Sequence, residues 1–246
     1  MSVKIPTIPS VNKFLIITLS LFILISISCA PLYIPNNVNA PLLSKKGEAA
    51  IGINYGMSGL NVHSSYAPIN NFAVMLNYAY LSSTAKSNGY DDEYLRKQRF
   101  GEIALGYFSE IGENGVAEIY IGGGMGKASS IDDFLSIAST KIYADGTYYR
   151  LFVQPNFGFK YRAFEGGFAL RGCYLNFTKV KYENYDLDVS TSNYFVEPVV
   201  FLRMGGPLIK FQAQFGFSRK VDIEDFVTYD PFIFGLGISL RLGSKL

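Results

Sequence analysis

Histidine, cysteine and tryptophan are scarce in this chain of 246 residues. It has one histidine, His63, two cysteines, Cys29 and Cys173, and no tryptophan. A single histidine with two isolated cysteines excludes a His/Cys metal site of ordinary ligand number. We therefore expect no metal and no other cofactor.

Long apolar runs are also missing. The apolar stretch 14–27 has 14 residues, whereas a spanning helix needs about 20. Lys4 and Lys13 precede it, and Ser28 and Cys29 follow it. A basic start, a short apolar core and small residues before a cleavage point are typical of a secretory signal peptide, here residues 1–28. The alternative is a short membrane-anchor helix.

The end of this segment, Ser26-Ile27-Ser28-Cys29, resembles a bacterial lipobox, in which the cysteine is acylated and becomes the first mature residue. Ser26 departs from the leucine that is usual at that position. We predict lipidation at Cys29, which would leave Cys173 without a disulfide partner. The alternative is ordinary cleavage nearby, which would leave Cys29 as a free thiol.

An excess of charge of one sign is absent as well. Removal of residues 1–28 takes away Lys4 and Lys13 and leaves 20 basic and 20 acidic residues, so the net charge is near zero. Nothing in this balance indicates a nucleic-acid partner. Residues 29–47 contain Pro31, Pro35 and Pro41 without periodicity, and we predict an extended, lipidated tether that leads to the first strand.

Alternating strands are abundant in residues 48–246. The clearest, residues 232–242, places Phe, Leu and Ile on one face and Gly, Ser and Arg on the other, over the length of a transmembrane strand. Ten such segments are predicted, at 48–57, 60–66, 72–81, 99–108, 116–126, 148–162, 168–177, 194–204, 209–218 and 232–242.

The predicted connections alternate between tight turns and long polar loops, at 82–98, 127–147, 179–193 and 219–230. This pattern predicts an all-β fold, an antiparallel up-and-down transmembrane β-barrel of about ten strands in an outer membrane. We expect the N-terminus and the short turns on the periplasmic side and the long loops on the extracellular side. The alternative is a soluble periplasmic barrel or sandwich, whose apolar face would point inward.

Charged residues fall on the polar face of several predicted strands. We expect them to form a charge network in the lumen, because a buried unpaired charge is costly. The predicted members are Glu102, Glu118, Arg150, Lys160, Arg171, Glu197, Arg203, Lys210 and Arg241. A structural network that plugs the lumen and a narrow charged pore are both compatible with this set.

Two weaker patterns bear on chemistry. His63 and Ser65 share a strand face and are faintly similar to the base and nucleophile of outer-membrane lipid A deacylases. No third member is assignable, and a plain polar inner face is the favoured explanation. The long loops are acidic and aromatic, which suits either solvation or contact with lipopolysaccharide through divalent cations.

The chain also resembles a family. The stretches Cys29-Ala30-Pro31-Leu32-Tyr33-Ile34-Pro35-Asn36, Asn39-Ala40-Pro41-Leu42-Leu43 and Lys46-Gly47-Glu48 resemble the start of Bacteroidetes outer-membrane β-barrel proteins with a lipoprotein-like signal. Tyr66-Ala67-Pro68-Ile69 with Phe72-Ala73-Val74-Met75 resembles their first periplasmic turn. The likeness is best over residues 29–80. It implies an outer-membrane barrel and brings no catalytic residues. The acid-rich tag that follows the lipidated cysteine of surface-exported lipoproteins is absent, which agrees with a periplasmic anchor.

Together these patterns predict a lipid-anchored barrel of structural or interaction type, such as an accessory subunit of an envelope complex, and not an enzyme. The expected partners are outer-membrane lipid, lipopolysaccharide and an envelope protein. The alternatives are a narrow channel and, more remotely, a lipid-modifying hydrolase.

Overall fold

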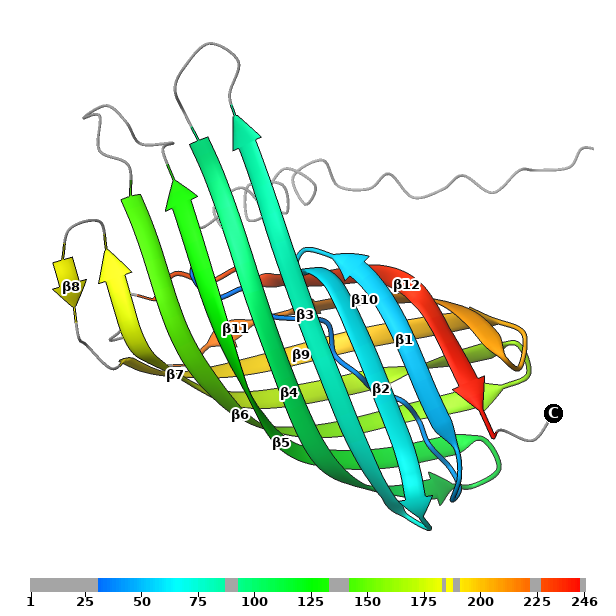
Figure 1. The fold of residues 1–246 in the computed structure, drawn as a ribbon. Helices are drawn as coiled ribbons and strands as arrows, with labels where there is room; N and C mark the ends of the chain where they lie inside the picture. Colours follow the sequence, from blue (N-terminus) through cyan, green and yellow to red (C-terminus); the bar gives the residue numbers. More distant parts are fainter. Residues whose placement is uncertain are drawn as a thin grey trace, which may run out of the picture.

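The computed structural model describes residues 31–86, 93–132, 142–182, 185–187, 191–221 and 227–243. The predicted signal peptide and Cys29 lie outside these ranges, as does most of the acidic-aromatic loop sequence. Within them the fold is all-β (Figure 1). The long strands are β1 (Ala49–Gly56), β2 (Gly59–Ile69), β3 (Phe72–Lys86), β4 (Glu93–Ile111), β5 (Gly115–Asp132), β6 (Ile142–Tyr161), β7 (Phe164–Tyr182), β9 (Thr191–Gly205), β10 (Ile209–Phe217) and β12 (Phe232–Leu242).

These ten strands close into a barrel, and the predicted fold class is confirmed. Each strand pairs antiparallel with its neighbours, and β1 pairs with β12 in the register Ala49↔Leu242. Two short strands, β8 (Tyr185–Leu187) and β11 (Arg219–Lys220), pair antiparallel with β7 and β9, respectively, and leave the β7–β9 pairing uninterrupted. Closure leaves the barrel itself without an exposed sheet edge.

The strands are longer than predicted at the long-loop end. Residues 82–86 and 93–98, expected in a loop, instead pair with one another up to Lys86↔Glu93. Residues 127–132 and 142–147 likewise continue β5 and β6. The alternation of apolar and polar residues fades in these extensions, as in Ser82-Ser83-Thr84, because both faces are polar there. The backbone ladder continues nevertheless, and periodicity alone could not detect it.

The barrel has two unequal walls. The short wall consists of β10, β12, β1 and β2, with 8 to 11 residues each. The tall wall consists of β3 to β7, with 15 to 20 residues each. Figure 1 shows the tall wall rising beyond the short wall at the long-loop end. At the other end the connections are tight, as at Asn71, which has a φ of 65° and donates from Nδ2 to Phe108 O.

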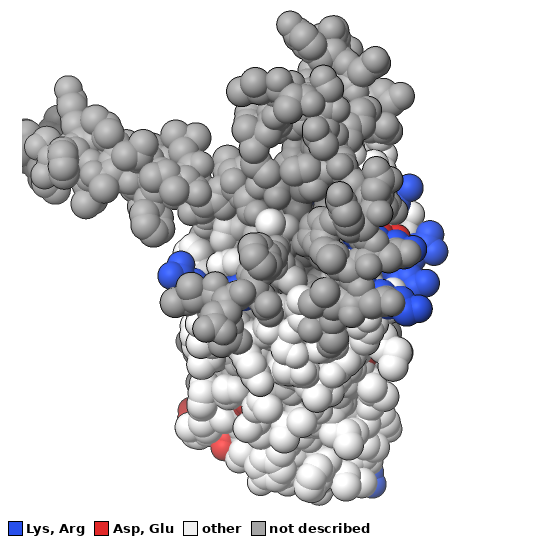
Figure 2. Space-filling model, turned by 90° about the vertical axis from the view of Figure 1, so that its left-hand side faces the viewer, with Lys and Arg blue, Asp and Glu red and all other residues white. Residues whose placement is uncertain are grey.

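The outward face of the strands is apolar and exposed. Met125, Leu105 and Phe211 are 76%, 68% and 66% exposed, and similar side chains surround the barrel. The inward face carries the buried Glu, Arg, Asn and Gln residues. Figure 2 shows a wide band of uncharged residues between charged groups at the two ends. An apolar belt of this extent is far larger than a soluble monomer exposes, and it identifies a transmembrane barrel rather than the soluble alternative.

No helix in the described ranges is long and apolar enough to cross a membrane.

Candidate functional site: the occupied lumen

The lumen is filled by the segment that precedes β1. Every residue from 31 to 43 is buried, and the segment makes no helix. We call residues 31–43 the plug. Thirteen extended residues span about 40 Å, which matches the thickness of a bilayer with its headgroups. Pro31, Pro35 and Pro41 suit this path, because proline favours an extended backbone and brings no N–H donor that would need a partner.

The plug begins at the long-loop end. Leu32 N and Tyr33 N donate to Thr228 O, in the connection between β11 and β12, at 2.9 and 3.1 Å. Asp230 N donates to Tyr33 O at 2.9 Å. Burial raises the pKa of the Asp230 carboxyl, although this carboxyl accepts a hydrogen bond from Phe232 N. The chain leaves at the short-turn end, where Gly47 N donates to Ala67 O.

This direction corrects the expected topology. The N-terminus was expected on the same side as the short turns, with a tether leading from there to the first strand. Residue 31 instead lies at the opposite end from those turns, and the tether runs through the lumen. The sequence did not reveal this, because the composition of residues 30–47 indicates an extended chain and carries no information about what surrounds it.

Near the long-loop end, aromatic rings and two ion pairs hold the plug. Tyr33 packs against Phe195 with ring centroids 4.8 Å apart. Its hydroxyl donates to Glu197 Oε1 at 2.9 Å and accepts from Arg150 Nη1 at 3.0 Å. Arg150 pairs with Glu102, and Arg171 pairs with Glu197 at 2.6 Å.

Amide side chains hold the middle of the plug. The Gln214 side chain pairs with both backbone groups of Val38, as an adjacent strand would. Its Oε1 accepts a hydrogen bond from Val38 N at 3.1 Å, and its Nε2 donates to Val38 O at 2.8 Å. Asn37 N donates to Asn61 Oδ1 at 3.1 Å. Both side-chain polar atoms of Asn37 remain without a partner in the described residues, as does His63 Nε2.

Near the short-turn end, cations hold the plug. Arg203 Nη2 donates to Ala40 O and Arg241 Nη2 donates to Pro41 O, both at 2.5 Å. Lys160 Nζ donates to Leu42 O at 3.0 Å. The plug carbonyl groups are buried in the lumen and do not take part in the hydrogen bonds between strands. A buried carbonyl without a partner is costly, and these cations supply the hydrogen-bond donors.

The nine residues of the predicted charge network all lie on the lumen side. Eight are buried and Lys160 is half-buried, at the short-turn end. Besides their ion pairs, several contact the plug directly: Arg171 Nη2 donates to Asn36 O at 2.8 Å, and Glu118 Oε1 accepts from Leu43 N at 2.8 Å. The network therefore holds the plug as well as balancing its own charges.

Sequence reasoning missed two carboxylates, Glu48 and Glu165. Glu165 lies within 2.7 Å of Arg241, 3.4 Å of Arg203 and 3.8 Å of Lys210, and Glu48 lies 3.1 Å from Arg241. Glu165 was assigned to a turn because β7 begins earlier than predicted. Extending the alternation of β7 backward from Arg171 by three steps would have placed Glu165 on the inner face.

His63 and Ser65 lie on the inner face of β2, which faces the plug. His63 Nδ1 lies 3.3 Å from Asn54 Nδ2, and Ser65 Oγ accepts from Asn39 Nδ2 at 2.9 Å. Both are buried, so neither contacts the lipid-facing surface. The described residues contain no group of three or more His, Cys, Asp and Glu that could hold a metal ion.

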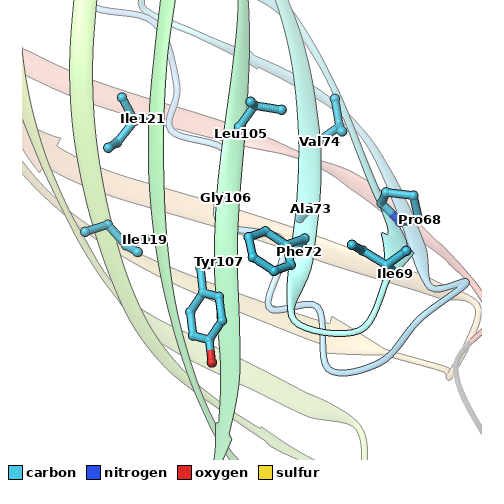
Figure 3. Close-up of a pocket in the computed structure, with 10 residues that line it drawn as sticks. All are labelled: Pro68, Ile69, Phe72, Ala73, Val74, Leu105, Gly106, Tyr107, Ile119 and Ile121. Atoms are coloured by element: carbon cyan, nitrogen blue, oxygen red, sulfur yellow. The ribbon is translucent and has the colours of Figure 1, made fainter.

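Two apolar grooves lie on the outer surface instead. One, of about 540 Å³ near the short-turn end, is lined by residues of β2 to β5, including Ile69, Phe72, Leu105 and Tyr107 (Figure 3). The other, of about 840 Å³, crosses β3 to β6 and is lined by Tyr78, Ile103, Met125 and Leu151, among others.

Comparison with solved structures yields distant likenesses. No protein-family model and no curated protein matches the chain. Among solved structures, the translocator domain of autotransporter NalP from Neisseria meningitidis is similar, with 12% identity and a TM-score of 0.47 over 79% of this chain and 86% of that one. The copper transporter OprC gives 10% identity and a TM-score of 0.23, covering 81% of this chain and 42% of that one.

Proposed function

We propose that this chain is a lipid-anchored outer-membrane barrel of structural or interaction type, closed by its own plug and without enzymatic activity. The observation that carries the proposal is the unbroken burial of residues 31–43 across the lumen. Arg171, Arg203, Arg241 and Lys160 all donate to backbone carbonyls of this segment or its end. Groups that hold a peptide in this way are not free to line a path for ions or solutes.

The anchor would then lie at the end with the long loops. Cys29 precedes Pro31 by two residues, and two residues span at most about 7 Å. With the long loops extracellular, an acyl chain on Cys29 would enter the outer leaflet. The anchor and the tall wall would therefore share one side of the membrane, a favourable arrangement for a scaffold that presents the tall wall to an envelope protein.

This topology is tested on intact cells. One epitope is inserted between residues 87 and 92 and another in the turn at 112–114, and cells are labelled with a palmitate analogue with and without Cys29→Ala. We expect surface antibody binding for the first epitope only, label only when Cys29 is present, and a compact band in SDS that shifts on boiling. Label without Cys29, or surface exposure of the second epitope alone, would contradict the proposal.

A closed lumen is tested in planar bilayers. We expect the full chain to conduct no steady current and a variant lacking residues 31–43 to conduct, provided that the variant still gives the compact band. Steady current from the full chain would favour the second candidate, a narrow channel. The observation in favour of that candidate is that the plug is held without a covalent bond and that Asn37 has unpartnered polar atoms at its middle.

A partner protein is tested by extraction in mild detergent. We expect an envelope protein to accompany the wild-type chain reproducibly when the tagged barrel is purified from its native membrane. Purification of the barrel as a lone species, at full yield and in several mild detergents, would contradict the accessory-subunit part of the proposal.

A further inference from the structure

A row of basic side chains crosses the outer face of the tall wall. Arg99 of β4 lies opposite Lys127 of β5, Lys127 opposite Thr147 of β6, and Thr147 opposite Lys179 of β7. The three basic side chains are exposed. Adjacent strands are about 4.8 Å apart, so the row extends about 14 Å from Arg99 to Lys179. Figure 2 shows Lys and Arg atoms gathered where the uncharged band meets the long-loop end.

Among the residues that the structure describes, no carboxylate balances the charge of this row. Arg99 lies over the ring of Tyr80 at 5.6 Å, and within the described ranges no ion pair involves Arg99, Lys127 or Lys179. Above the groove, Asp145 is the one outward carboxylate among the described side chains of β4 to β7, and it lies opposite Lys181 in the ladder. Like charges directly opposite one another on neighbouring strands repel. An anion that bridges Arg99 and Lys127 would remove this repulsion.

An apolar groove begins directly below the row. Gly101 follows Arg99 by two residues on β4 and Met125 precedes Lys127 by two on β5, so both occupy the same outer face one step nearer the membrane centre. They line the groove of about 840 Å³ together with Tyr78 and Leu151. Gly101 and Gly123 contribute no side chain and so form part of its floor. A Cβ at Gly101 would meet only Tyr78 Cδ2, at 3.8 Å, so there is room above it.

We propose that this face of the tall wall binds one phosphorylated lipid with several acyl chains. Its phosphates would contact Arg99, Lys127 and Lys179, and an acyl chain would lie in the groove. Guanidinium and ammonium groups are the usual protein partners of phosphate. A row of about 14 Å exceeds the reach of one phosphate, which favours a large headgroup with more than one. The inference rests on the proposed function only in requiring the barrel to lie in a membrane.

The test is native mass spectrometry of the full-length protein in detergent, titrated with deep-rough lipopolysaccharide, the same lipid after dephosphorylation, phosphatidylglycerol and phosphatidylcholine. We expect one lipopolysaccharide molecule to be retained, and the other three lipids to bind at least about tenfold more weakly. We also expect retention to fall with added salt, because the contacts are exposed ion pairs. Equal retention of the dephosphorylated lipid or of phosphatidylglycerol would overturn the proposal.

Two variants test separately how the basic row and the apolar groove contribute to lipid binding. The triple variant Arg99→Gln, Lys127→Gln, Lys179→Gln should lose about tenfold in lipopolysaccharide affinity. Gly101→Leu, which fills the groove and changes no charge, should lose severalfold. The control, Lys45→Gln, Lys46→Gln, Arg162→Asn, removes the same number of charges near the short-turn end and should bind normally.

Unchanged binding by both test variants, or equal loss in the control, would overturn the proposal. A compact band in SDS shows that each variant is folded. If the triple variant does not fold, the proposal is still tested by the affinity of Gly101→Leu for lipopolysaccharide and by the binding of the dephosphorylated lipid to the wild-type protein. Because that band and the Cys29 label test the membrane barrel separately, failure of this lipid site is distinguishable from failure of the proposed function.

Discussion

The two ends of the lumen hold the same plug by different means. At the long-loop end, Tyr33 lies among aromatic rings, and two separate pairs, Arg150–Glu102 and Arg171–Glu197, flank it. At the short-turn end, Glu165 is shared by three cations, Arg203, Lys210 and Arg241. Arg203 and Arg241 also donate to plug carbonyls.

This difference shows where the plug depends on charge. Glu197 would keep two hydrogen-bond donors if Arg171 were lost, because Tyr33 Oη and Ser218 Oγ also donate to its carboxylate, at 2.9 and 3.0 Å. Glu165 has only cations as partners among the described residues. Arg241 pairs with both Glu48 and Glu165 and also donates to two plug carbonyls, those of Pro41 and Leu42. We therefore expect the short-turn end to be the more sensitive to loss of this one charge and the long-loop end to be the more tolerant.

The largest effect is expected for Arg241→Met. It removes the closer of the two cations that pair with Glu48, leaving Lys160 at 3.8 Å, and one of the three cations that pair with Glu165. It also leaves Pro41 O without its donor. Breaking a buried ion pair from one side costs about 3–5 kcal/mol in the free energy of unfolding. The measurement is the urea midpoint of the compact band in SDS. Arg162→Met, an exposed change at the same end, is the control and should shift the midpoint little; an equal shift in both would contradict the prediction.

A smaller loss is expected for Arg171→Met at the long-loop end. Glu197 keeps its two hydroxyl donors, so we expect about 2 kcal/mol, in the range for losing one charged hydrogen-bond partner. The same urea titration, run beside Arg241→Met, gives the ratio of the two effects. If Arg171→Met proved the more damaging of the two, the asserted difference between the ends would be wrong.

Gly235→Ala tests the middle of the plug, between the two ends. A Cβ at Gly235 would overlap Asn37 Nδ2, so the plug must shift, at a cost of about 1–3 kcal/mol. Gly52→Ala is the matched control, because its Cβ would meet nothing closer than 3.7 Å. We expect brief openings in planar bilayers for Gly235→Ala and none for Gly52→Ala. Identical stability and silence in both variants would mean that the plug does not occupy this position.

The smallest effect is expected for Tyr33→Phe. The ring and its packing remain, while the hydroxyl that joins Glu197 to Arg150 is lost, at a cost of about 1 kcal/mol. Tyr55→Phe, an exposed tyrosine on β1, provides the comparison and should leave the urea midpoint unchanged. A shift for Tyr33→Phe as large as that for Arg171→Met would show that the hydroxyl, rather than the ion pairs, governs the long-loop end.

Much of the barrel was predictable from alternation alone. The predicted faces of 232–242 match the exposed and buried faces of β12, because side chains alternate along a strand and the pattern can be recognised from neighbouring residues alone. The upper parts of β3 to β6 were missed where that alternation ends. Glu165 was missed because the start of β7 was placed too late.

The sequence by itself determined the number of barrel strands, the apolar and the polar face of each, and nine of the charged residues that the lumen contains. Only the tertiary structure decided that residues 31–43 thread the barrel, which end they enter and which carbonyl each cation holds. The reason is physical. A strand's face is set by neighbours two residues away, whereas the plug is held by partners far along the chain, such as Arg203 for Ala40 and Arg241 for Pro41, which meet it only when the barrel closes.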